Sequence, residues 1–149
     1  MAEFLANAVQ VVQLNNPIIF TSSIPCNRGY IYHEDETGNF ILRGIVNNSC
    51  CEFARYQVIY SGNIAVPEGG TVGPIAVAIT VNGEPRIPSR AIVTPAAVDQ
   101  YFNVTSPAII SVPRGCCFNV SVRAIPASDD ATTIAIEVQN SNLVINRIA

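Results

Sequence analysis

Residues 116–124 read Cys-Cys-Phe-Asn-Val-Ser-Val-Arg-Ala, and apolar and polar side chains alternate along this stretch. A period of two is typical of a β-strand that buries one face. Residues 132–139 alternate in the same way, with Ile134, Ile136 and Val138 on one face. Both stretches therefore predict half-buried strands.

The composition of the 149 residues favours strands throughout the chain. There are 19 Ile and 17 Val but only 4 Leu, and β-branched residues fit a pleated sheet better than a helix. Charged residues make up 13%, about half the usual share, and all eight cations are Arg. A hydrophobic share of 49% excludes a disordered chain. Because the pI is near 5.0 and no Arg cluster exists, we expect no nucleic-acid partner.

Short apolar runs separated by turn residues recur at about ten-residue intervals, which is typical of a sandwich or barrel. The clearest turn is 81–84, Val-Asn-Gly-Glu, because Asn-Gly tolerates the positive φ angles of a type I′ hairpin. No linker or repeat divides the chain, so we expect one jelly-roll domain at 16–149, preceded by an N-terminal arm or extra strand at 1–15. Strands are expected at 9–14, 17–21, 29–33, 39–44, 55–65, 74–81, 86–94, 101–105, 108–112, 118–124, 132–139 and 142–148.

Residues 30–40 resemble a turn of the complement globular-head and tumour necrosis factor superfamily, which carries a Tyr-Asp-x-x-Thr-Gly-x-Phe pattern. Thr37, Gly38 and Phe40 fit that pattern. Residues 54–58, Ala-Arg-Tyr-Gln-Val, stand where the family has a Gly-x-Tyr-x-Phe strand. The chain is therefore similar to this superfamily in the order of its motifs.

Two further segments carry the same resemblance. The hairpin at 81–83 is similar to the central hairpin of bacterial members, and 142–149 looks like the family's last strand. The resemblance covers 9–149, and its nearest kin are the C-terminal domains of collagen-like spore-surface (exosporium) glycoproteins and related phage proteins.

The resemblance implies an all-β fold, a jelly-roll β-sandwich of about ten antiparallel strands, that associates as a tight homotrimer. Such trimers bury apolar and aromatic residues near the threefold axis. The low charge content agrees independently, because it indicates a surface that other subunits cover. The chain lacks the Gly-x-y collagen stalk that usually carries such a head.

Cys26, Cys50, Cys51, Cys116 and Cys117 are cross-link candidates. Because the count is odd, at least one thiol is free or bonded to another chain. Adjacent Cα atoms lie about 3.8 Å apart, below the disulfide range, so a bond within either doublet would be strained. Bonds between the doublets, bonds to a neighbouring subunit, buried free thiols and a zinc site stay open. If the strand extends through the second doublet, Cys116 faces the core and Cys117 points outward.

His33, Glu34, Asp35 and Glu36 form the one dense polar cluster of the sequence. The three carboxylates are weak candidates for calcium, which needs six or more oxygens, whereas side chains of adjacent residues point apart. A solvated loop without a metal is therefore expected. His33 is the only histidine and no nucleophile motif accompanies it. We expect no enzyme activity and no cofactor.

Six side chains are candidate interface residues. Arginine forms bidentate pairs with carboxylates and is less strongly hydrated than lysine, so it suits subunit boundaries; compositional drift is the alternative explanation for the missing lysines. The two aromatic candidates either pack in the trimer or form a stacking platform for a sugar. The candidates are Arg55, Arg86, Arg90, Arg123, Tyr101 and Phe102.

These patterns favour a non-enzymatic structural protein whose homotrimers build or decorate a spore surface, an extracellular fibre or a virion, with disulfides locking the assembly. The alternative is a trimeric head that binds a glycan or a surface receptor. A third option, an enzyme subunit, needs a pocket around His33. No run reaches the 18 apolar residues of a membrane span, and residues 1–14 lack the basic start of a signal peptide. The expected partner is another copy of the chain.

Overall fold

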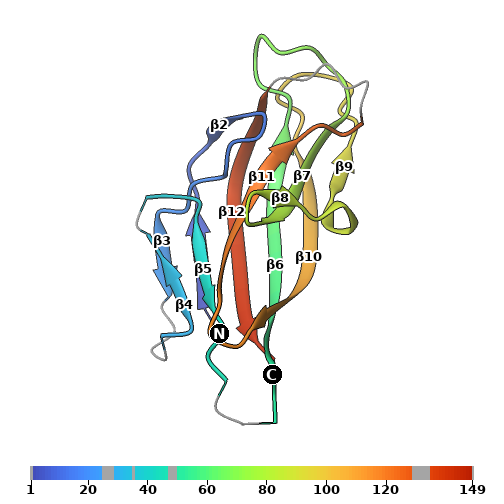
Figure 1. Ribbon diagram of the computed structural model, residues 1–149. Helices are drawn as coiled ribbons and strands as arrows, with labels where there is room; N and C mark the ends of the chain where they lie inside the picture. The colour runs from blue at the N-terminus through green and yellow to red at the C-terminus, as the bar shows by residue number, and fades with distance from the viewer. Residues whose placement is uncertain (1, 25–28, 35, 47–49, 129–134, 149) are drawn as a thin grey trace.

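The computed structural model describes residues 2–24, 29–34, 36–46, 50–128 and 135–148. These residues form twelve β-strands and one short 3-10 helix, arranged as two antiparallel sheets packed face to face (Figure 1). The prediction of an all-β jelly-roll sandwich is confirmed. In the part of the chain that the structure describes, no helix is long and apolar enough to cross a membrane.

The first sheet contains the longest strands, in the order β10–β6–β12–β1–β3, and β2 also pairs with β12. β12 lies between β6 and the two N-terminal strands, so Ala2 stands opposite Ile145. This sheet therefore joins the beginning and the end of the sequence. Its strands are β10 (Phe102–Pro113), β6 (Phe53–Ala65), β12 (Ala135–Arg147), β1 (Ala2–Ala6), β2 (Gln10–Gln13) and β3 (Ser22–Ile24).

The second sheet has the order β4–β5–β11–β7–β8, with β9 also paired to β7. Asn82 and Gly83 have φ angles of 52° and 86°, and Val81 pairs with Glu84, which confirms the predicted type I′ hairpin. The strands are β4 (Ile31–His33), β5 (Phe40–Arg43), β11 (Cys117–Ile125), β7 (Ile75–Val81), β8 (Glu84–Pro85) and β9 (Ala91–Val93), and the 3-10 helix η1 spans Ile87–Ser89.

The core fills the space between the two sheets. Val120, Val122 and Ala124 of β11 are fully buried, as the alternation in 116–124 predicts. Large side chains of the first sheet meet them, and each contributes about 1.5–3 kcal/mol through burial. Fully buried members from that sheet include Tyr56, Tyr60, Ile64, Leu143 and Ile145.

Tyr60 brings a polar group into this core. Its hydroxyl lies 3.0 Å from Ser141 Oγ, and burial raises the pKa of Tyr60 to about 12. A Cβ on Gly62 would lie 2.4 Å from the Tyr60 hydroxyl oxygen. Glycine at position 62 therefore makes room for the phenol to satisfy its hydrogen bond.

The two strands expected at 101–105 and 108–112 are one continuous strand, β10. Pro107 lies in its middle, opposite Ile59. Proline lacks an N–H and is tolerated on an edge strand, where one side of the backbone has no ladder to complete. β10 lies at such an edge, so the proline does not divide it.

The strands expected at 132–139 and 142–148 are likewise one strand in the described residues, β12, interrupted by a bulge. The register shifts between Gln139 and Asn142, and Asn140 adopts a left-handed φ of 53°. Val138 is buried before the bulge and Leu143 after it. The bulge thus reverses the parity of the strand, so that both halves place apolar side chains in the core.

Two other expected strands are only partly formed. Within 17–21 the pairing is a single bridge from Pro17 to Arg123, and the neighbouring strand β3 begins at Ser22. Within 86–94 the chain forms η1 before β9. Pro88 has a fixed φ and no N–H, which suits the first turn of a helix better than a ladder.

Candidate assembly interface

The outer face of the first sheet, turned away from the second sheet, carries four rows of uncharged side chains. β6 contributes every second residue from Gln57 to Asn63, because side chains alternate across a strand. Strand pairing places a residue of β10 on one side of each of these β6 residues and a residue of β12 on the other side. No described side chain in these rows is charged. The rows are Ile109–Gln57–Asn146, Pro107–Ile59–Val144, Thr105–Ser61–Asn142 and Asn103–Asn63–Gln139.

Polar groups on this face bond to one another within the sheet. Asn103 Nδ2 donates to Asn63 Oδ1 at 3.1 Å, and the hydroxyls of Ser61 and Thr105 lie 3.4 Å apart. An amide bonded once keeps further donor and acceptor capacity for a partner. Covering such groups costs much less free energy than covering unpaired charges. The face is therefore chemically suited to contact with another protein surface.

Exposed apolar side chains gather at both sides of the same sheet. Beside β10, Ile109 is 55% exposed, and so is Ile87 of η1, which contacts β10. On the opposite side of β12, Val11 of β2 is 56% exposed and Val9 is 50% exposed. Clustered apolar exposure of this kind marks interaction surfaces. The sheet thus has two apolar margins, and on the side of β2 two carboxylates lie next to the rows: Glu3 is opposite Val144, and Glu137 is opposite Val11.

The sequence matches no protein-family model and no curated protein. The globular domain of zebrafish complement 1qA is 11% identical with a TM-score of 0.57, covering 96% of this chain and 94% of that chain. Eiger TNF from S. frugiperda is 10% identical with a TM-score of 0.58, covering 100% and 92%. This chain has the complement 1q and tumour necrosis factor jelly-roll fold.

The turn that carried the resemblance has a structural role in this jelly roll. Thr37 Oγ1 donates to Glu34 O at 2.7 Å, and a Cβ on Gly38 would lie 2.4 Å from Ile18 O. His33 stacks on Phe40 with ring centroids 4.4 Å apart. The Thr-Gly-x-Phe pattern thus closes a tight turn and anchors it to the core.

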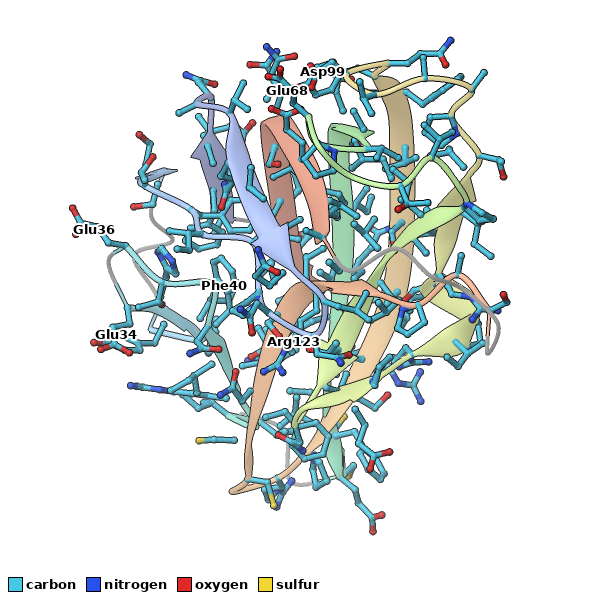
Figure 2. All side chains as sticks on the ribbon, turned by 90° about the horizontal axis from the view of Figure 1, so that it is seen from above. Glu34, Glu36, Phe40, Glu68, Asp99 and Arg123 are labelled. Atoms are coloured by element: carbon cyan, nitrogen blue, oxygen red, sulfur yellow. The ribbon has the colours of Figure 1, made fainter. Side chains whose placement is uncertain are left out.

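The carboxylates of this turn do not converge. Glu34 and Glu36 are exposed and point outward, away from Phe40 (Figure 2), while Asp35 lies outside the described residues. Over the described ranges, no group of three His, Cys, Asp or Glu side chains is placed to hold a metal ion. Glu34 and Glu36 therefore belong to a solvated turn.

The four arginine candidates lie on different parts of the jelly roll. Arg55 is exposed on the outer face of β6, just beyond the uncharged rows, and Arg86 Nη1 donates to Ile109 O at 2.8 Å. Arg90 is half-buried after η1. Arg123, on the second sheet, donates through Nε to Ser121 Oγ at 3.1 Å. Arg55 and Arg86 thus border the rows, whereas Arg123 does not.

Tyr101 lies in a carboxylate cluster at one end of the sheet. Burial and the neighbouring Glu137 carboxylate raise the pKa of Tyr101, which hydrogen-bonds to Glu137. Glu68 and Asp99 lie near each other (Figure 2), and the charges of both act on Glu137. The other aromatic candidate, Phe102, is 37% exposed at the start of β10. Tyr101 is thus half-buried against an acidic group, and Phe102 lies at the margin of the sheet.

The expectation that Cys116 faces the core is wrong. β11 begins at Cys117, and Cys116 lies in a tight turn in which its N–H bonds to Pro113 O at 3.0 Å and Gly115 has a φ of 78°. Both cysteines of this doublet are exposed, as the outward direction of Cys117 predicts. Cys51 is exposed too, which removes the buried-thiol alternative for these three.

A disulfide between the doublets, one of the alternatives left open by the sequence, is not present in the described residues. Cys51, Cys116 and Cys117 are free thiols, and Cys26 lies outside the described residues. The doublets occupy separate turns, so the sequence spacing alone gave no measure of their distance. Cross-linking to another chain stays a prediction.

Sequence reasoning missed the apolar margins and the uncharged rows. The pattern of 103–111 carries a signal for Ile109, because a period of two places it on the same face as the polar residues Asn103, Thr105 and Ser111. The rows could not be read from one strand, since each row combines residues from three distant segments.

Proposed function

We propose that this chain is a non-enzymatic structural module that forms homotrimers through the outer face of its first sheet. The observation that carries the proposal is the set of uncharged rows between Gln57 and Asn63. A solvated face normally carries charged side chains, whereas a face between subunits is depleted of them. The rows therefore favour a covered surface.

The position of the apolar margins supports a cyclic assembly. The margin beside β10 and the margin at β2 lie on opposite sides of the sheet. A contact between the β10 margin of one copy and the β2 side of the next joins two different patches, and such a contact forms a ring where the rotation between copies closes. The superfamily resemblance implies closure at three copies.

The proposed place of these trimers is an external surface, where they build or decorate a spore, an extracellular fibre or a virion. Support comes from the resemblance to the C-terminal domains of spore-surface glycoproteins and from the fold shared with complement 1qA and Eiger TNF.

Size-exclusion chromatography coupled to light scattering tests the assembly. We expect a particle of three times the 15.9 kDa chain mass. Ile109→Arg should dissociate it, because a buried unpaired charge at an interface costs several kcal/mol. Reductant should leave the trimer itself intact, because the proposed contact is non-covalent, and should remove only disulfide cross-links between chains.

Tyr32→Arg is the matched control. Tyr32 is 50% exposed on β4 of the second sheet, away from the proposed interface. A wild-type monomer would overturn the proposal, and so would equal dissociation by both substitutions.

A further inference from the structure

Two exposed cysteine doublets lie at one end of the jelly roll. Cys50 and Cys51 are in the connection from β5 to β6, and Cys116 and Cys117 are at the start of β11. Both connections lie at the lower end in Figure 1, where the marked termini also lie. We call the described residues 43–46, 50–52 and 113–117 the thiol rim.

Backbone hydrogen bonds tie the two connections of the thiol rim together. Gly44 N–H donates to Cys116 O at 2.8 Å, and Gly115 N–H donates to Gly44 O at 3.0 Å. A Cβ on Gly44 would lie 1.9 Å from Pro113 O, so only glycine permits this approach. The thiols are therefore carried by a tightly joined pair of turns.

Each doublet has an arginine beside it. Cys117 stands opposite Arg43 in the β11–β5 ladder, and side chains opposite each other share a face with Cβ atoms about 5 Å apart. Arg114 Nη2 donates to Cys51 O at 2.5 Å. Glu52 is the one acidic side chain among the described rim residues. The rim thus combines exposed thiols with a net positive charge, the surroundings in which reactive cysteines are found.

We propose that the thiol rim is a covalent attachment site that undergoes thiol–disulfide exchange with anionic disulfides, such as those of acidic cysteine-containing peptides. The two arginines concentrate an anionic reactant near the thiols. A second copy of the chain presents the same positive charge, so like-charge repulsion opposes pairing of one rim with another. Charge complementarity therefore selects an acidic reactant over self-pairing.

The exchange balances without a further oxidant. A rim thiolate attacks one sulfur of the incoming disulfide, and the new S–S bond forms as the old one breaks. The departing sulfur takes the proton that the rim thiol released. The rim cysteine is oxidised and the departing half of the reactant is reduced.

The doublet spacing favours a lasting attachment. Displacement of the attached group by the adjacent cysteine would require a bond between neighbours, whose Cα atoms lie about 3.8 Å apart, below the disulfide range. An adduct on Cys117 is therefore not readily resolved by Cys116. The same reasoning holds for Cys51 and Cys50.

The test compares two small disulfides of opposite charge, oxidised glutathione, which is anionic, and cystamine, which is cationic. Reduced full-length protein is mixed with each at neutral pH and low salt, and adducts are counted over time by mass spectrometry. After division by their rates with free cysteine, glutathione disulfide should react about fivefold faster than cystamine. That preference should vanish at about 1 M salt. Equal normalised rates at low salt would overturn the proposal.

Variants assign the effect to the rim. The double substitution Arg43→Gln with Arg114→Gln should remove the preference, whereas Arg86→Gln, an exposed arginine outside the rim, should retain it. Cys51→Ser and Cys117→Ser should each lower the adduct yield. A preference that survives the double substitution contradicts the proposal, as do disulfide-linked dimers that form faster than adducts. Because all these side chains are exposed, the variants should fold.

Discussion

At the residue scale, Glu137 is a carboxyl group whose surroundings oppose its ionisation. Burial raises the pKa of Glu137, and the hydrogen bond to Asp99 and the charges of Asp99 and Glu68 raise it further, while the hydrogen bond from Tyr101 lowers it. One oxygen, Oε2, is buried without a hydrogen-bond partner. The group lies on β12, just beyond the uncharged rows. Ionised Glu137 therefore weakens the folded state.

Replacing Glu137 with Gln should raise the Tm at neutral pH. A carboxyl whose pKa is raised by folding holds its proton more tightly in the folded state. Its favourable contribution is complete below the unfolded pKa of about 4.3 and is lost as the pH rises through the folded pKa. The Tm gain of Glu137→Gln should thus appear at pH 7 and vanish near pH 3. Thermal melts at both pH values test this, with the exposed Glu84→Gln as control; an equal gain at both would contradict it.

At the element scale, the bulge in β12 decides which side chains enter the core. Val138 and Leu143 are both buried although five positions separate them, an odd number that would place them on opposite faces of a regular strand. The left-handed Asn140 supplies the change of parity. One residue thereby sets the orientation of the C-terminal half of the strand.

Deleting Asn140 should unfold the chain. The deletion turns Leu143 and Ile145 outward or forces the register to slip, and burial of each contributes about 1.5–3 kcal/mol. The combined loss is comparable with the whole stability of a domain, about 5–15 kcal/mol. Asn140→Gly should change stability by less than about 1 kcal/mol, because glycine adopts a positive φ readily. Urea unfolding compares the two variants, and a deletion variant as stable as wild type would refute the role of the bulge.

At the scale of the whole molecule, the low charge content and the uncharged rows of the first sheet both favour a surface that other copies cover. Few charges are available for solvation. Near the first sheet, Arg55 and Glu137 lie beyond the central rows, and Glu3 lies beside Val144, where its carboxylate accepts a hydrogen bond from Asn142. If copies cover these rows, folding and association are linked, and the apparent stability depends on protein concentration.

The Tm of the wild-type protein should therefore rise with concentration. Association stabilises only the folded chain, so a higher concentration shifts the equilibrium toward the assembled state. Scanning calorimetry over about a hundredfold range of concentration measures this shift. Ile109→Arg should make the Tm lower and independent of concentration, and Tyr32→Arg should preserve the wild-type dependence. A constant wild-type Tm would argue against linked folding and association.

The strands could be predicted where their signal is local. Alternation in 118–124 and the Asn-Gly pair at 82–83 each depend on a few neighbouring residues, and both predictions are confirmed. The expected strands 101–105 and 108–112, and likewise 132–139 and 142–148, are separate in the prediction because a sequence does not state whether a strand lies at an edge or contains a bulge. The inward prediction for Cys116 depends on a strand that extends through the doublet, whereas β11 begins one residue later, at Cys117.

The candidate surfaces could be predicted only in part. Low charge indicated a covered surface, but its location required the pairing of β6 with β10 and β12. The thiol rim joins turns near Gly44 and Gly115, about seventy positions apart in sequence, and only the topology brings them together.

The pairing of Ala2 with Ile145 also sets the order in which a growing chain acquires its structure. During synthesis, β1 and β6 emerge long before β12, their shared neighbour in the sheet. Until residue 135 leaves the ribosome, these apolar strands have open edges and an unfinished ladder, conditions that slow folding and invite aggregation. A chain released before β12 has been synthesised should therefore be a substrate for chaperones and proteases rather than a smaller folded jelly roll.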